Sequence, residues 1–592
     1  MKIMDAQGQV SVCPKEEELG VIRHTAAHIL AQAVKRLYPH AHFAFGPATE
    51  NGFYYDIDFS GGEKPGADAL ETIEAEMRTI IRENLPIKAF CAERKEALAL
   101  MADRGENYKC EHIAELPAEE ELSFFRQGEY IDFCRGPHLT HTGALGSGNF
   151  CLTGISGSYW KNDAARTPLT RISGTAFRTA AELAEHKRFL AEAAMRDHRK
   201  IGREMGLFLF SDAGLGFPFF LPDGVVLRNE LLSFWRRLHT ENGYKEISTP
   251  QLLCRSLWEQ SGHWAHYAEN MYQSEIDGEP YCIKPMNCPG GVLVYKSVPH
   301  SYRELPLRLA ELGLVHRHEL RGTLHGLFRV RCFTQDDAHI FLTQAQIPDE
   351  IERVIRLIDE IYRKFGFSYT MELSTRPENS MGSDEDWQAA EEGLCTALER
   401  GGYSYTVNPG DGAFYGPKID FHLRDTLGRT WQCGTIQLDF QLPQNFDLSY
   451  IDENNRRVRP VMIHRTCFGS VERFLGILTE HCAGRFPTWL APVQVKILTL
   501  PGCDMDYVRE ISAFLLSRGI RCVTDDRDEK IGYKVREARQ VGRVPYMVII
   551  GARECENRVL SVRRRPVSGG EKGDETVTMT PEELTAQIQK EV

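Results

Sequence analysis

The chain has 592 residues, a formal net charge of −13 and a pI near 5.9. This length suits about four domains of ordinary size, so a multidomain enzyme is expected. The negative charge excludes a protein that coats nucleic acid or anionic membrane along its whole surface, and any nucleic-acid contact is expected to be local.

The sequence predicts neither secretion nor insertion into a membrane. No run approaches the roughly 18 apolar residues of a membrane span, and the first residues lack the apolar segment of a signal peptide. The 16 cysteines are scattered without a C-x-x-C pair, which is typical of reduced thiols rather than of a disulfide framework or a zinc ribbon. We therefore expect a cytoplasmic protein with no membrane partner.

In chain order, the predicted elements divide the sequence into five parts, which indicates a multidomain α+β and α/β protein. Residues 1–20 read as a short leader, and residues 21–179 mix helices with short apolar strands, as in an α+β domain. Residues 180–205 are rich in Ala, Glu, Lys and Arg, which predicts a linker helix. Residues 206–488 alternate β-rich runs with long helical stretches, which favours a mostly antiparallel sheet flanked by helices. In residues 489–592 strands alternate with helices, as in a small α/β domain.

The stretch HTAAH in the second part places His24 and His28 on one face of a helix. A zinc-protease helix would read HExxH, but Thr25 follows the first histidine, so that interpretation fails. Two incidental histidines on an amphipathic helix are the alternative. About a hundred residues downstream, DFCRGPH adds Cys134 and His138, and two such pairs in one domain favour a shared site.

Together with NGFYYDID and RGENYK, these pairs resemble the editing domain of threonyl-tRNA synthetases and, more distantly, that of alanyl-tRNA synthetase. In the threonyl family this pocket hydrolyses a wrongly charged aminoacyl ester without a bound metal, which would explain the missing Glu. The resemblance implies that the two pairs line the pocket, that Lys109 and Asp132 assist, and that Tyr55 lies nearby. A zinc site built from the same four side chains is the alternative.

The central part resembles the antiparallel-sheet catalytic core of class II aminoacyl-tRNA synthetases. VHRHELRGTLHGLFRVRCFTQDDAHIFL resembles motif 2, which implies that Arg317 stabilises the α-phosphate in the transition state. GSVERF resembles motif 3 and supplies Arg473 as the second nucleotide arginine. The offsets imply that Glu319 contacts the adenine amino group, Arg329 the γ-phosphate and Phe333 the ring. For one arginine alone, a solvated strand face is the alternative.

Motif 1 is the weakest of the three resemblances. The helical segment NELLSFWRRLHTENGY leads to STP with Pro250, and in the family this motif belongs to a dimer interface. The motif alone does not establish a dimer, but the resemblance as a whole implies a homodimer.

Three separated residues resemble the zinc ligands of the threonyl family: Cys288 in KPMNCPGG, His339 in FTQDDAHIF and His464 in VMIHR. Each alone is more simply read as a buried core residue. As a Cys-His-His set with an open coordination position, they imply one Zn²⁺ per chain, which would bind the substrate through its amino group and β-hydroxyl. Mg²⁺ is expected with ATP.

This chemistry explains why one chain would hold two sites. Valine lacks the hydroxyl of threonine, and a site built for that group can reject such an analogue by roughly 10⁴-fold or more. Serine keeps both zinc-binding groups and lacks only a methyl, which is worth about 1–3 kcal/mol, or roughly 10- to 200-fold. A second site that hydrolyses seryl-tRNA is then required.

Local matches to the family imply further contacts with the substrates. His263 is expected to assist deprotonation of the terminal ribose hydroxyl, because neutral imidazole has a suitable pKa, although a hydrogen-bonded loop histidine is the alternative. The threonine pocket is expected to include Gln335, Asp337, Tyr415, Gln437 and Tyr267. Gln432, Thr435 and Lys418 are expected to contact the nucleotide, and Lys418 is also expected to be catalytic.

The last part carries a local positive surplus. Between Arg521 and Arg565, 12 Lys or Arg stand against 7 Asp or Glu, so an RNA backbone could bind there. DEKIGYKVREARQVGRVPYMVIIG resembles the anticodon-binding domain of several class II synthetases. A solvated charged face is the alternative. The residues implied to face the anticodon are Lys530, Arg536, Glu554 and Arg563.

Several positions depart from the family pattern. Threonyl enzymes commonly begin with a small ubiquitin-like domain, but His24 arrives so early that this domain is expected to be absent. Gly291 stands where many members have His, and Arg321 where Ser is frequent. Asp528 replaces a frequent Asn, which puts the anticodon contacts in doubt.

The sequence as a whole predicts a member of the threonyl-tRNA synthetase family. Such a protein would activate L-threonine with ATP, transfer it to tRNA(Thr) and hydrolyse mischarged seryl-tRNA(Thr). One alternative is a catalytically silent, synthetase-like protein that binds tRNA or regulates translation, but the intact motif arginines and zinc ligands argue against it. The other alternative is a metal-dependent hydrolase that uses His24 and His28.

Overall fold

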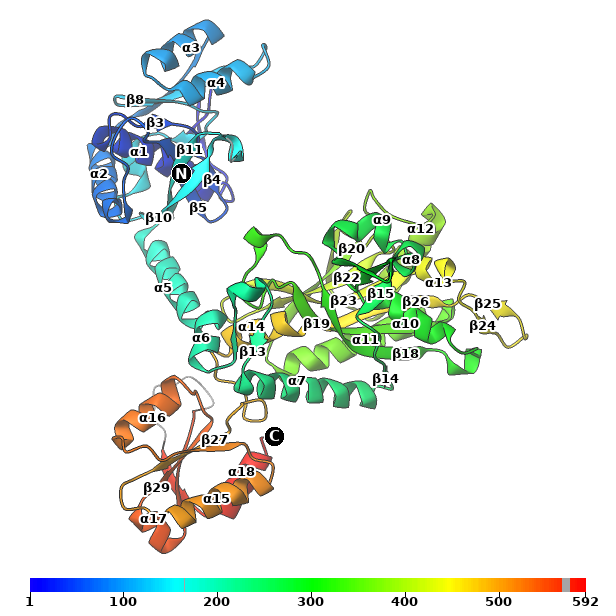
Figure 1. The fold of residues 1–592 in the computed structure, drawn as a ribbon. Coiled ribbons are helices and arrows are strands. Elements are labelled where there is room, and N and C mark those ends of the chain that lie inside the picture. Colours follow the sequence, from blue (N-terminus) through cyan, green and yellow to red (C-terminus); the bar gives the residue numbers. More distant parts are fainter. Residues whose placement is uncertain (164–165, 567–574, 592) are drawn as a thin grey trace. The chain divides into compact units, whose positions relative to one another are not determined.

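The computed structural model describes residues 1–163, 166–566 and 575–591, and the chain divides into two compact units, Met1–Ala191 and Glu192–Val592 (Figure 1). Each unit contains its own hydrophobic core. Within the described residues, no helix combines the length and the apolar character that crossing a membrane requires.

A long buried helix forms the centre of the first unit. α1 (Glu18–Leu37) packs against α2 (Leu70–Glu83) and an antiparallel sheet of order β10-β11-β5-β3, in which β4 also pairs with β5. These strands are β3 (His42–Phe43), β4 (Ala48–Thr49), β5 (Gly52–Asp58), β10 (Phe150–Tyr159) and β11 (Pro168–Ala176). The unit also contains a second sheet and two further helices: β6 (Ile87–Ala92), β7 (Leu122–Gln127), β8 (Tyr130–Phe133), α3 (Arg94–Asp103) and α4 (Asn107–Glu115). The α+β class expected for this region is confirmed.

The first residues of the chain differ from the separate leader that the sequence suggested. β1 (Lys2–Met4) pairs with β2 (Val10–Val12) and also with β9 (His138–Leu139). Residues 1–20 are therefore folded into the first unit, because they add strands to the short strand that carries His138.

The expected linker helix over residues 180–205 is two helices, α5 (Ala180–Arg196) and α6 (His198–Glu204). They are separated at Asp197, whose ψ of 118° is not helical. The carboxylate of Asp197 accepts the Arg199 N–H at 2.8 Å and so caps α6. The break follows from the preference of Asp for the N-cap over the helix interior.

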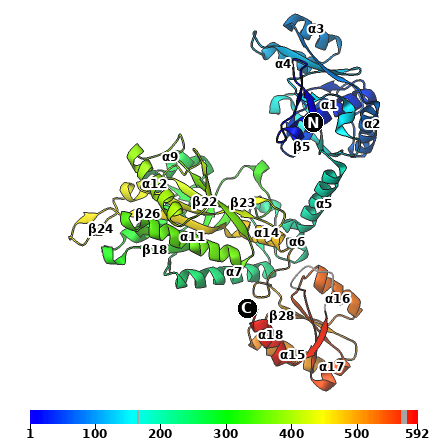
Figure 2. The same ribbon diagram turned by 180° about the vertical axis from the view of Figure 1, so that it is seen from behind.

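An eight-stranded sheet forms the centre of the second unit, in the order β14-β18-β19-β26-β23-β22-β20-β21 (Figure 2). The edge pairs β14–β18 and β20–β21 are parallel and the other neighbours are antiparallel, which confirms the expected class II type of sheet. The strands are β14 (Lys245–Glu246), β18 (Leu307–His316), β19 (Cys332–Leu342), β20 (Ser368–Ser374), β21 (Tyr405–Asn408), β22 (Lys418–Arg424), β23 (Thr430–Asp439) and β26 (Val461–Ser470).

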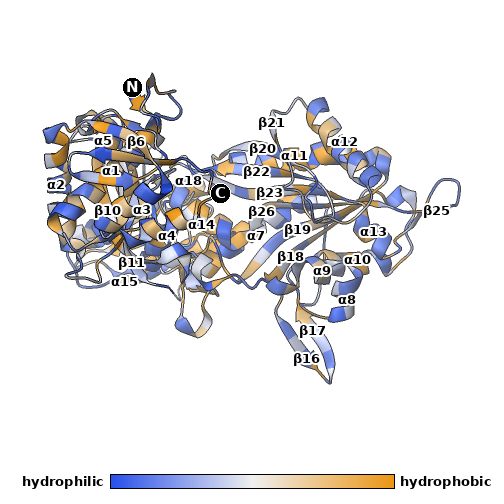
Figure 3. Cartoon of the chain, turned by 90° about the horizontal axis from the view of Figure 1, so that it is seen from above, coloured by the Kyte–Doolittle hydropathy of each residue, from blue (hydrophilic) through white to orange (hydrophobic). Residues whose placement is uncertain are grey.

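Helices cover both faces of this sheet. The larger apolar cluster packs the sheet against α7 (Pro222–Glu241), α11 (Ile347–Lys364), α12 (Asp384–Arg400) and α14 (Val471–His481). On the other face, a smaller cluster includes α10 (Cys288–Lys296) and α13 (Gln441–Asn445). The turn between β24 (Tyr450–Ile451) and β25 (Arg457–Val458) is exposed and hydrophilic (Figure 3).

The central region also contains shorter strands and helices. Its short strands are β12 (Phe208–Leu209), β13 (Phe219–Phe220), β15 (Leu252–Cys254), β16 (Gln273–Ile276) and β17 (Glu279–Ile283). Its short helices are α8 (Arg255–Gln260) and α9 (His263–Tyr267).

The last hundred residues form a five-stranded sheet of order β28-β27-β29-β30-β31. Its first three strands are parallel and the last two are antiparallel, which confirms the expected α/β class. The strands are β27 (Val495–Thr499), β28 (Cys522–Asp525), β29 (Tyr546–Ile550), β30 (Leu560–Arg564) and β31 (Thr576–Met579). The helices are α15 (Met505–Ser517), α16 (Ile531–Gln540), α17 (Ala552–Asn557) and α18 (Pro581–Gln589).

Candidate functional site

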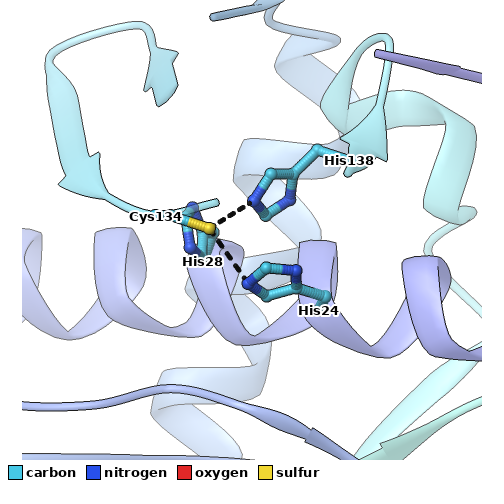
Figure 4. Close-up of side chains that lie close together, drawn as sticks. All are labelled: His24, His28, Cys134 and His138. Atoms are coloured by element: carbon cyan, nitrogen blue, oxygen red, sulfur yellow. Dashed lines mark hydrogen bonds between the residues drawn. The ribbon is translucent and has the colours of Figure 1, made fainter. Parts of the chain in front are cut away.

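The first candidate site gathers the four side chains of the two His and Cys motifs (Figure 4). His24 and His28 project from α1, Cys134 follows β8, and His138 begins β9. One ligand atom from each lies within 4.8 Å of the others. Sγ of Cys134 lies 3.2 Å from His24 Nε2 and 3.3 Å from His138 Nε2. The helical spacing of four brings His24 and His28 together and a tight loop brings Cys134 and His138 together, while the packing of the unit brings the two pairs side by side.

The loop between the Cys and His of the second motif depends on a glycine. Gly136 has a φ of 65°, a conformation that other residues adopt at a cost. A Cβ at this position would lie 2.6 Å from the ring of Phe125. The backbone N–H of Gly136 donates to Sγ of Cys134 at 3.2 Å. The glycine thus lets the loop turn back so that Cys134 faces the two histidines of α1.

The three residues expected to assist form a second network beside His28. Lys109 Nζ lies 2.8 Å from Asp132 Oδ1, and it also donates to the Tyr55 hydroxyl at 3.1 Å. The Tyr55 hydroxyl donates to Asp132 Oδ2 at 2.5 Å. His28 Nε2 lies 3.4 Å from the same oxygen. All of these groups are buried or nearly so, so a single carboxylate holds a lysine, a phenol and an imidazole in fixed positions.

Burial keeps the four His and Cys side chains uncharged. It lowers the pKa of His24 to about 4 and those of His28 and His138 well below the usual value. It also raises the pKa of the Cys134 thiol to about 12. At neutral pH the site therefore offers neutral imidazoles and a protonated thiol, which can orient water but make Cys134 a poor nucleophile.

A cavity of about 500 Å³ opens above this cluster. His24, His28 and Cys134 line it, whereas His138 is fully buried beneath them. The predicted residues that also line the cavity are Tyr55, Lys109 and Asp132.

The second candidate site lies on one face of the eight-stranded sheet. Successive residues of a strand point to opposite faces, so Gln335, Asp337 and His339 of β19 share one face, while Ala338 and Ile340 pack into the apolar core. The antiparallel register then aligns side chains of different strands in rows across the sheet. One row runs Lys418, Gln437, His464, His339. The next row runs Asp420, Thr435, Thr466, Asp337, Glu311.

The three expected zinc ligands converge on this face. One ligand atom from each of Cys288, His339 and His464 lies within 4.8 Å of the others, and all three residues are buried. His339 and His464 are direct cross-strand partners, and Cys288 is the first residue of α10, which packs over them. Both ring nitrogens of His339 are buried without a hydrogen-bond partner among the described residues. A buried imidazole without partners is costly, and a metal ion would satisfy it.

Nine of the predicted substrate and nucleotide residues line one cavity of about 230 Å³ beside these ligands. Arg317 is held there because its Nε–H donates to the Pro285 carbonyl at 3.1 Å. Arg473 is held likewise by the Phe328 carbonyl at 2.9 Å. The predicted residues in this cavity are Arg317, Glu319, Arg329, Phe333, Gln335, Gln432, Thr435, Gln437 and Arg473.

Two residues that are expected to contact the nucleotide, Arg329 and Glu319, form an ion pair with each other. Arg329 Nε lies 2.8 Å from Glu319 Oε2. The roles expected for them, the γ-phosphate for Arg329 and the adenine amino group for Glu319, would require this ion pair to open.

Several predicted residues lie beside the cavity rather than in its lining. Asp337 is buried, which raises its pKa to about 6, and its Oδ2 accepts from Asn287 Nδ2 at 3.3 Å. The Tyr415 hydroxyl donates to Gln437 Oε1, and its ring lies 4.9 Å from that of His464. The Tyr267 ring centroid lies 5.8 Å from Arg317 Cζ.

The two remaining catalytic candidates are engaged with protein groups. Nε2 of His263 lies 3.4 Å from Cys288 Sγ, and burial lowers its pKa to about 3. Lys418 Nζ lies 2.9 Å from Asp411 and 2.8 Å from Asp420. His263 is thus a neighbour of the expected metal ligands, and Lys418 belongs to a row of residues that ends at them.

Two buried residues next to the candidate sites escaped the sequence analysis. Thr25 hydrogen-bonds His138 in the first site, and Asp439 hydrogen-bonds His464 in the second. Asp439 lies two residues after Gln437 on β23, so strand alternation alone could have placed it on the same face. The place of Thr25 between the two histidines was a signal in the sequence, but its partner could not be read from it.

The four residues expected at the anticodon face lie on three elements of the last domain. Lys530 precedes α16, and Arg536 is exposed on it. Glu554 of α17 accepts from the Gly551 N–H at 2.9 Å and from the Ser561 hydroxyl at 2.8 Å. Arg563 of β30 donates to the Thr576 hydroxyl at 2.9 Å. The glutamate therefore has a structural role in any case, whereas the two exposed cations are free to meet a ligand.

Three family models match the chain. Residues 272–482 match the tRNA synthetase class II core domain (G, H, P, S and T), residues 492–591 match an anticodon binding domain, and residues 122–173 match the threonyl and alanyl tRNA synthetase second additional domain. The first candidate site thus overlaps the last of these domains, and the second lies in the core domain.

Whole-chain relatives agree with these matches. The threonine–tRNA ligase of Clostridium tetani is 56% identical over 561 residues, which cover 95% of this chain and 87% of that protein. The ligase of Acetivibrio thermocellus is 58% identical over 544 residues, 92% of this chain and 85% of that protein. A crystal structure of the RNA binding domain of threonyl-tRNA synthetase from Cryptosporidium parvum Iowa II aligns with a TM-score of 0.64 at 39% identity, over 67% of this chain and 98% of that one. The chain therefore belongs to the threonine–tRNA ligase family.

Proposed function

We propose that this protein activates L-threonine with ATP, transfers it to tRNA(Thr) and hydrolyses seryl-tRNA(Thr) formed in error. The observation that carries the synthetic half of the proposal is the convergence of Cys288, His339 and His464 beside the cavity that holds both motif arginines. Family membership supports the same reaction.

We assign the second unit's central region, residues 206–488, to adenylate formation. Arg317 and Arg473 are each fixed through Nε by a backbone carbonyl, so their guanidinium groups are oriented before ATP arrives. Preorganised cations of this kind stabilise the charge that develops on a transferred phosphoryl group. Phe333 and Gln432 line the same cavity and would hold the adenine. Mg²⁺ is proposed to accompany ATP.

The donor set of Cys288, His339 and His464 suits Zn²⁺, because one thiolate and two imidazoles leave a coordination position open. When bound, the ion would act as a Lewis acid for the amino group and hydroxyl of the amino acid. Gln437 lies in the same row of the sheet as the two histidines, and Asp337 and Gln335 follow on the same face of β19; all three would orient the same substrate by hydrogen bonds. His263 and Lys418 keep their proposed catalytic roles. His263 is neutral, but burial lowers its pKa to about 3, so it is a weaker base than an ordinary imidazole.

We assign residues 21–179, together with the strands of the first 20 residues, to editing. The neutral His28 lines the cavity and can hold a water molecule by one of its hydrogens, while the Lys109–Asp132 pair can orient the substrate and His24 lies beside them. Water rather than Cys134 is the proposed nucleophile, because burial keeps the thiol protonated.

Residues 489–592 are proposed to bind the anticodon of tRNA(Thr), through the exposed Lys530 and Arg536 and through Arg563. The surplus of cations between Arg521 and Arg565, in a chain of opposite net charge, supports this assignment. A homodimer and a cytoplasmic location are also proposed, on the basis of family membership.

The decisive experiment is threonine-dependent ATP–pyrophosphate exchange with protein whose zinc content is measured. We expect exchange that prefers threonine over valine, with one zinc per chain. Absence of exchange in zinc-loaded protein would contradict the synthetase proposal and favour a catalytically silent tRNA-binding protein. Ester or peptide hydrolysis without tRNA would instead favour a metal-dependent hydrolase.

A further inference from the structure

Thr25 stands between the two histidines of the first motif, at the position where a zinc-protease helix has its catalytic Glu. Its side chain is fully buried. Its hydroxyl oxygen accepts the backbone N–H of Leu139 at 3.0 Å and lies 3.2 Å from Nδ1 of His138. The residue thus ties the helix of the first motif to the strand of the second.

These two contacts favour one direction of the hydrogen bonds. Leu139 can only donate to the Thr25 oxygen, and among the described residues the structure records one other hydrogen-bond neighbour of this hydroxyl, Nδ1 of His138, so that nitrogen is the acceptor available to the hydroxyl proton. A neutral imidazole that accepts at Nδ1 carries its proton on Nε2. The Nε2–H of His138 then points to Sγ of Cys134, 3.3 Å away.

The hydrogen bonds continue through the Cys134 thiol in the same donor-to-acceptor direction. Sγ of Cys134 receives the N–H of Gly136 at 3.2 Å as well as that of His138. Its own proton is therefore directed to Nε2 of His24, at 3.2 Å. The ring of His24 also hydrogen-bonds the backbone of Pro137, a residue that has no N–H to offer, and because Nε2 faces the thiol we infer that Nδ1 is the donor. The chain of hydrogen bonds begins at the N–H of Leu139 and ends two residues earlier, at the carbonyl of Pro137.

We propose that Thr25 is a positioning residue that sets opposite tautomers on His138 and His24 and thereby directs the Cys134 thiol proton toward His24. The inference rests on the editing function proposed above. Cys134 and His24 line the cavity, so the direction of this chain decides which groups at its floor donate and which accept. Without the hydroxyl, His138 is free to take its proton on Nδ1, and the thiol can then turn its proton away from His24.

The same arrangement opposes a metal at this site. His138 directs a proton, not a lone pair, at the centre of the four side chains, and its other nitrogen is already bound by Thr25. A zinc site needs unprotonated nitrogens and a thiolate. Thr25 would thus explain how a pocket with four potential ligands could carry out the proposed hydrolysis without a metal.

The test compares Thr25→Val, which removes the hydroxyl at nearly constant volume, with Thr25→Ser, which keeps it. Seryl-tRNA(Thr) deacylation by the full chain is expected to slow about 10- to 100-fold in T25V and to stay within about 3-fold of the parent in T25S. Threonine-dependent pyrophosphate exchange should be unchanged in both variants. If T25S is as slow as T25V, or if T25V equals the parent, the inference is overturned.

A second measurement reads the protonated nitrogen of His138 directly in the parent protein. In full-length protein labelled with ¹⁵N-histidine, the His138 signals, assigned by their loss in His138→Ala, report which nitrogen carries the proton. We expect the proton on Nε2 in the parent and in T25S, and on Nδ1 in a substantial fraction of T25V. A proton on Nδ1 of the parent would overturn the inference.

The editing function and the role of Thr25 can be disproved separately. If the parent deacylates seryl-tRNA(Thr) no faster than a Cys134→Ala, His138→Ala double variant, the editing function is wrong, whatever the tautomer. If the parent is fast and His138 carries its proton on Nδ1, the editing function stands and the role of Thr25 is wrong.

Discussion

Nε2 of His464 lies 2.9 Å from Oδ2 of Asp439, and both side chains are buried. The other oxygen of Asp439 accepts the N–H groups of Gln441, at 2.6 Å, and Leu442, at 3.1 Å, so the carboxylate is fixed by the start of α13. Because the carboxylate takes the proton on Nε2, it leaves the lone pair of His464 on Nδ1. A carboxylate that supports a histidine in this way is a common partner of metal-binding imidazoles.

Replacing Asp439 by Asn should weaken zinc binding about 10- to 100-fold. The amide can donate to Nε2 of His464 and so favours a proton on Nδ1, where the ligand lone pair is needed. Competition for zinc with a chromogenic chelator would measure the change. Asp526→Asn, an exposed aspartate of the last domain, is the control and should leave the affinity unchanged. Equal zinc affinity in the Asp439 and Asp526 variants would contradict the role of Asp439.

The first unit should lose stability in mild acid. Burial lowers the pKa of His24 from 6.5 to about 4, so between these pH values the unfolded chain binds a proton that the folded chain does not. The stability due to the neutral imidazole is therefore fully present above pH 6.5 and is lost as the pH falls toward 4, by up to about 3 kcal/mol. His28 and His138 shift in the same direction and add to the loss.

Urea unfolding of the full chain at pH 7 and pH 5, with hydrogen exchange of α1 as the local probe, would measure this loss. His24→Asn should reduce the difference between the two pH values, since its side chain does not titrate. His40→Asn serves as control, because His40 lies outside the cluster. A pH dependence that survives His24→Asn in full would show that other groups cause it.

A glycine of the motif 2 segment should control ATP binding through a buried histidine. Nδ1 of His198 lies 2.6 Å from Glu480, and its Nε2 accepts the N–H of Leu327 at 2.9 Å. The neighbouring Gly326 has a φ of 49°, and a Cβ there would lie 2.2 Å from Nε2 of His198. Phe328, two residues after Gly326, lines the nucleotide cavity, and its carbonyl accepts a hydrogen bond from Arg473.

Gly326→Ala should therefore raise the KM for ATP about 10-fold, which corresponds to about 1.4 kcal/mol, with little change in the KM for threonine. Steady-state exchange kinetics would separate the two constants. Gly366→Ala is the matched control, because Gly366 also has a positive φ, 76°, but nothing lies within 4 Å of its added Cβ. If both variants raise the KM for ATP equally, backbone strain and not the histidine contact is responsible.

Arg536 should contribute to tRNA affinity mainly through its charge. It is exposed on α16, within the segment of cation surplus. If it neutralises one phosphate, Arg536→Ala should weaken tRNA(Thr) binding and reduce the slope of log K against log salt by about 1. Filter binding at several salt concentrations would measure both. Arg518→Ala, exposed on the same domain but before the surplus begins, should change neither. A loss of affinity with an unchanged slope would point to a base contact.

The sequence by itself determined the features that depend on local spacing. The helical period placed His24 and His28 on one face, and strand alternation placed Gln335, Asp337 and His339 on another. Composition and periodicity were also enough for the fold class of each domain, because amphipathic patterns arise from burial within single elements.

Only the tertiary structure decided which elements meet and in what register. The pairing of His339 with His464 joins strands more than a hundred residues apart, and the pairing of β1 with β9 turns an expected leader into part of a sheet. Strand alternation could place Asp439 on the face of the site, but the partners of Asp439 and Thr25 lie elsewhere in the sequence, so no local pattern could reveal those two hydrogen bonds. Side-chain period is local, whereas register and tautomer depend on which groups the whole fold packs together.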